Sequence, residues 1–217
     1  MRLKKIRDDL GGTIDSEDNL ARMILIEQAI DAAHDIDEEI SRSYAYCDCV
    51  IGIVEFAREG NNDHVLERVP LLLDKIMNTG AYVRAQSFYA LALASFDRAE
   101  EANEILVDAI RNAVSIKDDF DRRDALLDIA TTAADISLLT DNDEMINTAL
   151  NLSDELTQGQ KAYLYGYLSV ILTGEEAVSL MREAVDLANE INDPITKSKV
   201  FLELSSLQSN FNRKFEL

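Results

Sequence analysis

The sequence contains little glycine and proline and no tryptophan, with only eight Gly and two Pro among its 217 residues. Tight β-turns and flexible linkers depend on Gly and Pro, so their scarcity argues against a β-rich fold. The abundant Ala and Leu residues favour helix. The composition therefore predicts an all-α chain.

Apolar runs are also short. The longest uncharged stretches, 85–96 and 162–174, do not reach the roughly 20 residues that a membrane-spanning helix needs. Residues 1–10 carry four cations with no apolar run behind them, unlike a secretory leader. The chain has two cysteines, and without a secretory leader their small number favours a reducing compartment. We therefore expect a cytoplasmic protein that does not enter the membrane.

Positive charge is scarce as well. Lys and Arg number 21 against 41 Asp and Glu, which gives a formal net charge of −20. Such a surface repels the phosphate backbone of nucleic acids and anionic lipids. It favours basic partners instead. The charge thus argues against nucleic-acid or membrane binding.

A repeat of about 40 residues runs through the chain. Its apolar anchors are Ile36, Ile76, Ile116, Leu156 and Ile191. Seven residues before them lie Ala29, Val69, Ala109, Ala149 and Ala184. Shortly after them come the cations Arg42, Arg84, Arg122, Lys161 and Lys197. A period of this length is typical of solenoids, in which each repeat is one supersecondary unit stacked on the next.

Helical periodicity follows each cation. Apolar or small residues three, four, seven and eight places later form one face of a helix. The fourth-place residues, expected at equivalent positions, are Tyr46, Phe88, Leu126, Tyr165 and Phe201. This pattern predicts five A helices, at about 41–58, 82–96, 120–138, 160–173 and 195–210. Five B helices with the anchors are predicted at about 17–35, 63–77, 98–115, 142–155 and 175–190. Pro70 should kink or split the second B helix.

Residues 162–194 carry a family resemblance. Gly166, Ala177 and Ala184 fall near the small-residue positions of the tetratricopeptide repeat, and Pro194 falls near its terminal proline. The chain therefore resembles the tetratricopeptide-repeat superfamily, with longer αα-repeats of the HEAT type as the alternative. The resemblance implies one solenoid domain over residues 1–217 with about five αα-hairpins, whose A helices line an inner surface that holds partner segments. Residues 1–12 are a candidate for a separate N-terminal helix.

Two groups of residues invite a catalytic interpretation. Cys47 and Cys49 are two residues apart, so on a helix their side chains point about 200° from each other and cannot easily share a metal ion. We expect buried structural cysteines. Asp118, Asp119 and Asp121 resemble the aspartate-rich motif of isoprenoid diphosphate enzymes. The second metal-binding motif of those enzymes has no good counterpart here, so we expect helix capping by these carboxylates.

The outward strip of the A helices is the candidate binding surface. Its residues are Tyr44, Asp48, Gln86, Asp124, Asp128, Tyr163, Tyr167 and Lys199. Two interpretations stay open: a solvated face, or a groove with tyrosine anchors for a basic or amphipathic segment. The recurring cations could grip carboxylates of a partner, but we favour a structural role that locks adjacent repeats. The sequence thus predicts a non-catalytic protein-interaction or scaffold module, with self-association as a further option. No cofactor is expected, and an all-helical metal-dependent enzyme that uses the Asp-rich clusters is the alternative.

Overall fold

The computed structural model describes residues 17–215, and the side chains of residues 19–209, and this part of the chain forms helices and no strand. The all-α prediction is therefore confirmed. The chain divides into two compact units, Met1–Ile116 and Lys117–Leu217. A single domain over residues 1–217 stays a prediction, and the helix expected in residues 1–12 lies outside the described residues.

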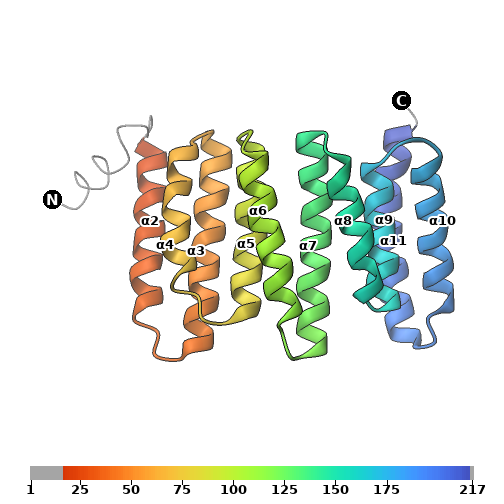
Figure 1. Cartoon of the computed structure of the whole chain (residues 1–217), viewed down its shortest axis with the longest axis horizontal. Helices are drawn as coiled ribbons and strands as arrows, with labels where there is room; N and C mark the ends of the chain where they lie inside the picture. Colours follow the sequence, from red (N-terminus) through yellow and green to blue (C-terminus); the bar gives the residue numbers. More distant parts are fainter. Residues whose placement is uncertain (1–16, 216–217) are drawn as a thin grey trace. The chain divides into compact units, whose positions relative to one another are not determined.

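The first unit contains two pairs of packed helices. Its elements are α2 (Glu17–His34), α3 (Glu39–Gly60), the 3-10 helix η1 (Asp63–Arg68), α4 (Val69–Leu73), α5 (Thr79–Ser95) and α6 (Ala99–Val114). The helix α3 packs against α2, α4 and α5, and α5 packs against α6 (Figure 1). The predicted B helix at 63–77 is split into η1 and α4, with Pro70 in the first turn of α4. A proline in this place costs no helical hydrogen bond.

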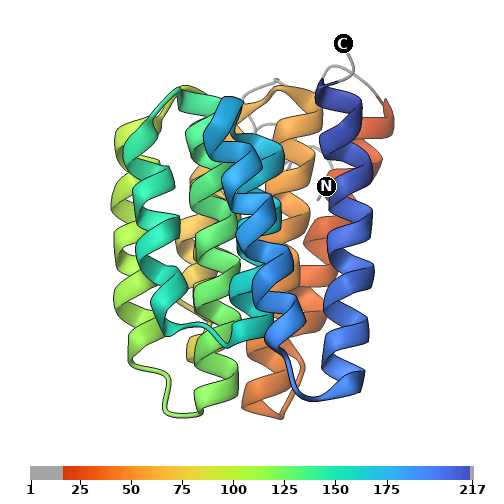
Figure 2. The same ribbon diagram turned by 90° about the vertical axis from the view of Figure 1, so that its right-hand side faces the viewer.

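The second unit is arranged around α9. Its elements are α7 (Asp119–Thr140), α8 (Asp143–Leu152), the 3-10 helix η2 (Ser153–Glu155), α9 (Gln158–Ile171), α10 (Gly174–Glu190) and α11 (Pro194–Phe215). The helix α9 packs against α7, α10 and α11. The helices α10 and α11 also contact each other and lie side by side in Figure 2. The predicted A helices correspond to α3, α5, α7, α9 and α11.

Polar side chains begin the A helices. The caps are Glu38, Asn78, Asp118, Thr157 and Asp193. The carboxylate of Asp118, for example, accepts hydrogen bonds from the backbone N–H groups of Phe120 and Asp121 at 2.9 and 3.0 Å. Such a cap satisfies N–H groups that have no partner inside the helix. The capping interpretation of Asp118 is confirmed.

The caps correct the predicted register of the second repeat. Four residues after its cap, each A helix donates a backbone hydrogen bond to the cap carbonyl, and in α5 this donor is Tyr82 rather than Arg84. The residue eight places after the cap is Tyr46 in α3 but Gln86 in α5, two positions before Phe88. The prediction that Phe88 is equivalent to Tyr46 was therefore wrong. The alignment followed the cations, and Arg84 does not occupy the position that Arg42 does.

The cations four residues after the caps turn back toward the preceding B helix. Arg42 Nη1 donates to the carbonyl of Ile36 at 3.0 Å. Lys197 Nζ donates to the carbonyl of Asn189 at 2.5 Å, in α10. Lys161 Nζ forms an ion pair with Asp154 of η2 at 2.9 Å. Cations suit the carbonyl-rich, negative ends of helices. These contacts give the three cations a structural role at the start of their helices, and the locking of adjacent repeats stays a prediction.

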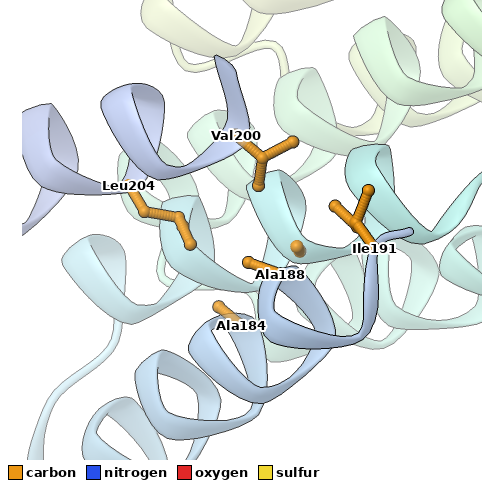
Figure 3. Close-up of a cluster of buried hydrophobic side chains, with 6 residues drawn as sticks. Ala184, Ala188, Ile191, Val200 and Leu204 are labelled. Carbon is orange, nitrogen blue, oxygen red and sulfur yellow. The ribbon is translucent and has the colours of Figure 1, made fainter. Parts of the chain in front are cut away.

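Glycine allows α9 and α11 to approach closely. A Cβ atom on Gly166 would lie 2.4 Å from Cδ2 of Leu204, and one on Gly159 would lie 3.2 Å from Cγ2 of Val200. Val200 and Leu204 belong to a buried cluster that also includes residues of α10. Figure 3 shows both side chains projecting from α11 into this cluster. The small residues of α9 thus determine how closely α11 packs.

We predict that Gly166→Val destabilises the second unit. The β-branched side chain would overlap Leu204, which is only 3% exposed, and overpacking of this kind costs about 1–3 kcal/mol. The measurement is the free energy of unfolding from urea denaturation followed by circular dichroism. The matched control is Gly60→Val, because a Cβ atom there has no neighbour within 4 Å. Equal stabilities of the two variants would contradict the close-approach account.

We also predict that Ile129→Ala lowers the unfolding free energy by about 2–5 kcal/mol, because it leaves a cavity in the core. Ile129 lies on α7 and is fully buried. Leu138→Ala, on the same helix but 65% exposed, should change the free energy by no more than about 0.5 kcal/mol. Similar losses in both variants, measured by the same denaturation, would contradict the assigned core face of α7.

Candidate functional site

The N-terminal halves of α7, α9 and α11 line a groove of about 430 Å³ in the second unit. Three of the predicted strip residues lie in its wall, one from each helix: Asp124, Tyr163 and Lys199. Other wall residues are Phe120, Ile195 and Glu203. The structure therefore brings together part of the predicted strip in one concave surface.

The caps explain why these residues share a face. Positions two, six and ten residues after a cap are spaced by four, and residues four apart lie above one another on a helix. On α7 these positions hold Phe120, Asp124 and Asp128. On α9 they hold Gly159, Tyr163 and Tyr167, and on α11 they hold Ile195, Lys199 and Glu203. The three helices therefore present their second, sixth and tenth positions on the groove side, and at the second position α7 and α11 carry the large apolar side chains Phe120 and Ile195.

Two large apolar side chains in the groove are exposed to solvent. Phe120 is 71% exposed and Ile195 is 81% exposed. Exposed apolar side chains that gather in a concave surface mark sites of interaction. The sequence interpretation missed both residues because it did not follow the strip one turn further toward the caps. The same extension reaches Ile40 on α3, which is 53% exposed.

The two tyrosines of α9 form a stacked pair. Their ring centroids are 6.2 Å apart and the ring planes differ by 27°. The hydroxyl of Tyr167 donates to Oδ1 of Asp135 at 2.6 Å, which fixes the ring against α7. Burial raises the pKa of both phenols, and the nearby carboxylates of Glu203 and Asp128 raise the pKa of Tyr163 further. Both tyrosines therefore stay neutral at physiological pH.

The second unit carries a net negative charge, whereas the groove wall contains charged side chains of both signs. Residues 117–217 include nineteen acidic and nine basic side chains. In the groove wall, Asp124 and Glu203 occur together with Arg123 and Lys199. Asp124 also accepts a hydrogen bond from Nε2 of Gln160 at 2.6 Å. The long-range field thus favours basic partners, whereas the wall offers charges of both signs.

The remaining strip residues belong to the first unit. Tyr44 and Asp48 lie on α3 with exposed side chains, and Tyr44 is 44% exposed. Gln86 differs from the prediction, because it is only 3% exposed and its Oε1 accepts a hydrogen bond from Nδ2 of Asn112 at 3.1 Å. Its inward position follows from the cap of α5. The outward positions of α5 are held by Arg84 and Phe88.

The cysteines and aspartates considered for catalysis have structural surroundings. Cys47 and Cys49 are free and buried, and burial raises the pKa of each thiol to about 11. Asp119 forms an ion pair with Arg122 at 2.6 Å. Among residues 17–215, no group of three or more His, Cys, Asp or Glu side chains is placed to hold a metal ion. In the same range, every helix is too short or too polar to cross a membrane.

No family model matches the sequence, and neither a curated protein nor a solved structure matches it.

We predict that the thiols of Cys47 and Cys49 are unreactive in the folded protein. A pKa of about 11 leaves so little thiolate at pH 8 that reaction should be at least about 100-fold slower than for an ordinary cysteine. The measurement is the rate of reaction with Ellman's reagent, with and without denaturant. Rapid labelling of two thiols in the absence of denaturant would contradict the burial of these side chains.

Proposed function

We propose that this protein is a non-catalytic interaction module that holds a partner segment in the groove of α7, α9 and α11. The observation that carries the proposal is the exposure of Phe120 and Ile195 in a concave wall beside the half-buried Tyr163. Aromatic side chains that are already partly ordered lose little conformational freedom on binding, and tyrosine is common in binding hot spots.

The architecture that we propose is a solenoid of αα-hairpins. Its support is the recurrence of helix caps at intervals of about 40 residues. Further support comes from packing within each unit, where α3 contacts α5, and α9 contacts both α7 and α11. In the tetratricopeptide-like arrangement that the sequence resembles, such successive A helices line the surface that receives a partner.

The proposed partner is an amphipathic segment with basic side chains. Its apolar side chains would cover Phe120 and Ile195, which are otherwise exposed to water. Its Lys or Arg side chains suit the acidic field and the carboxylates Asp124 and Glu203. The cations Arg123 and Lys199 disfavour a segment that is basic along its whole length.

An enzyme based on the Asp-rich cluster has less support. Asp118 is engaged as the cap of α7, and Asp119 is paired with Arg122. These contacts give the carboxylates a structural task. The groove, in contrast, gathers the exposed apolar side chains of Phe120 and Ile195, whose exposure to water contributes nothing to folding stability.

The proposal can be tested with a library of random 12-residue peptides displayed on phage and selected against the full chain. We expect enriched peptides that combine apolar residues with Lys or Arg and that bind less tightly as salt is added, because salt screens the attraction. Peptides that bind equally well to Phe120→Ser and Ile195→Ser variants would contradict the proposed groove. These exposed positions are suitable because substitution there should leave folding intact.

For a peptide selected in this way, we predict different kinetic effects of the groove residues. Tyr163→Ala should raise the dissociation rate by about tenfold or more, because a packed aromatic anchor holds the complex once it has formed. Its control is Val185→Ala, the truncation of an exposed apolar side chain on α10 outside the groove wall. The measurement is surface plasmon resonance, and equal dissociation rates for the two variants would contradict the assigned anchor.

Charge reversal should act mainly on association. Asp124→Lys together with Asp128→Lys should lower the association rate and flatten its dependence on salt, because long-range attraction steers the encounter. The matched control is a double variant with Asp186→Lys and Glu183→Lys, two exposed residues of α10 that lie outside the groove wall. Equal association rates for the two double variants would show that only the net charge matters.

A further inference from the structure

The stacked pair Tyr163 and Tyr167 lies on α9, near charged side chains of α7 and α11. Tyr163 of α9 shares the groove wall with Glu203 of α11. Asp128 follows Asp124 by one turn on α7 and is exposed. The negative charges of Glu203 and Asp128 act on the phenol of Tyr163. Tyr163 and Glu203 thus lie in the groove wall, and Tyr167 on α9 and Asp128 on α7 follow one helical turn beyond that wall.

The rings are held in position by the fold. Tyr167 is tied to Asp135 by the 2.6 Å hydrogen bond, and Tyr163 stacks on Tyr167 at an angle of 27°. Asp135 therefore serves to orient Tyr167. A surface that is ordered before binding loses little entropy when a ligand covers it.

The chemistry of this place suits a planar cation. The faces of aromatic rings attract cations, and carboxylates add charge-assisted hydrogen bonds. A guanidinium group is flat, stacks on aromatic faces and offers a fork of donors to a carboxylate. An ammonium group is a compact, strongly hydrated charge, and it gains less from a flat aromatic surface.

Building on the proposed function, we propose that this end of the groove, together with Tyr167 and Asp128 one turn beyond its wall, is a subsite for one arginine side chain of the bound segment. The rings of Tyr163 and Tyr167 would receive the face of the guanidinium group. The carboxylates of Asp128 and Glu203 would accept hydrogen bonds from its edge. Asp135 would act as a positioning residue through Tyr167.

Two cations of the groove wall bear on this subsite. Lys199 precedes Glu203 by one turn on α11, and Arg123 lies on the α7 side of the groove. Both repel an incoming guanidinium group, so each should weaken its binding. Removal of the charge of Lys199 should consequently strengthen arginine binding, which is opposite to the effect of removing Glu203.

The test uses three small probes: the acetylated methylamides of arginine, lysine and citrulline. Citrulline has nearly the shape of arginine but carries no charge. The full chain, with isotope-labelled tyrosine rings, is titrated with each probe and followed by NMR. We expect the signals of Tyr163 and Tyr167 to shift with arginine at concentrations about tenfold lower than with lysine, and not to shift with citrulline.

Substitutions test which side chains bind the arginine probe. Glu203→Gln and Asp128→Asn should each weaken arginine binding by about threefold to tenfold, and Lys199→Gln should strengthen it. Tyr167→Phe removes the bond to Asp135 and should reduce the preference for arginine over lysine while the chain stays folded. The control is Asp186→Asn on α10, which should leave the titration unchanged.

Failure of this subsite can be distinguished from failure of the groove. Equal shifts with arginine and lysine, or shifts that are indifferent to Glu203→Gln and Asp128→Asn, would overturn the arginine subsite. The proposed function would survive that result if selected peptides still lost binding in the Phe120→Ser and Ile195→Ser variants. If the peptides were indifferent to those two changes, the groove itself would be refuted.

Discussion

The cap at the start of each A helix is the constraint on which the rest of this structure depends. A polar side chain there satisfies N–H groups that the helix leaves unpaired, so the first residue of the helix is fixed. The direction in which each later side chain points from the helix axis is then determined by its distance along the sequence from the cap. The side chain eight residues after the cap is buried, as Tyr46 and Gln86 are. The side chain ten residues after the cap lies on the same side of the helix as the strip, as those of Tyr167 and Glu203 do. The four-residue spacing of the groove residues is a consequence of this register.

The groove also depends on how closely α9 and α11 pack. Gly159 and Gly166 keep one face of α9 free of bulk, so Val200 and Leu204 of α11 can fill the space above it. Ile195, at the first turn of α11, is 81% exposed. The close packing of α9 and α11 thus fixes where the first turn of α11, which carries Ile195, stands beside α9.

Much of the fold could be predicted from the sequence, because an amphipathic helix is recognisable from the periodic spacing of its apolar residues. Helix bounds and the split at Pro70 followed from local patterns. The register of α5 failed because the alignment relied on Arg84, whereas the cap Asn78 defines the equivalent position. Phe120 and Ile195 were recognisable only by extending the strip toward the caps. The contact of Tyr167 with Asp135 joins residues 32 positions apart on different helices, and no local pattern encodes such a contact.

The central claim is that the second unit holds a partner segment against the apolar rim of its groove. Photocrosslinking tests this most directly, with p-benzoylphenylalanine introduced separately in place of Phe120, of Ile195 and of Leu71. Leu71 is 67% exposed on α4 of the first unit and serves as the comparison. The account predicts that a peptide selected against the protein crosslinks from positions 120 and 195 and not from position 71. Crosslinking from position 71 with none from 120 or 195 would contradict it.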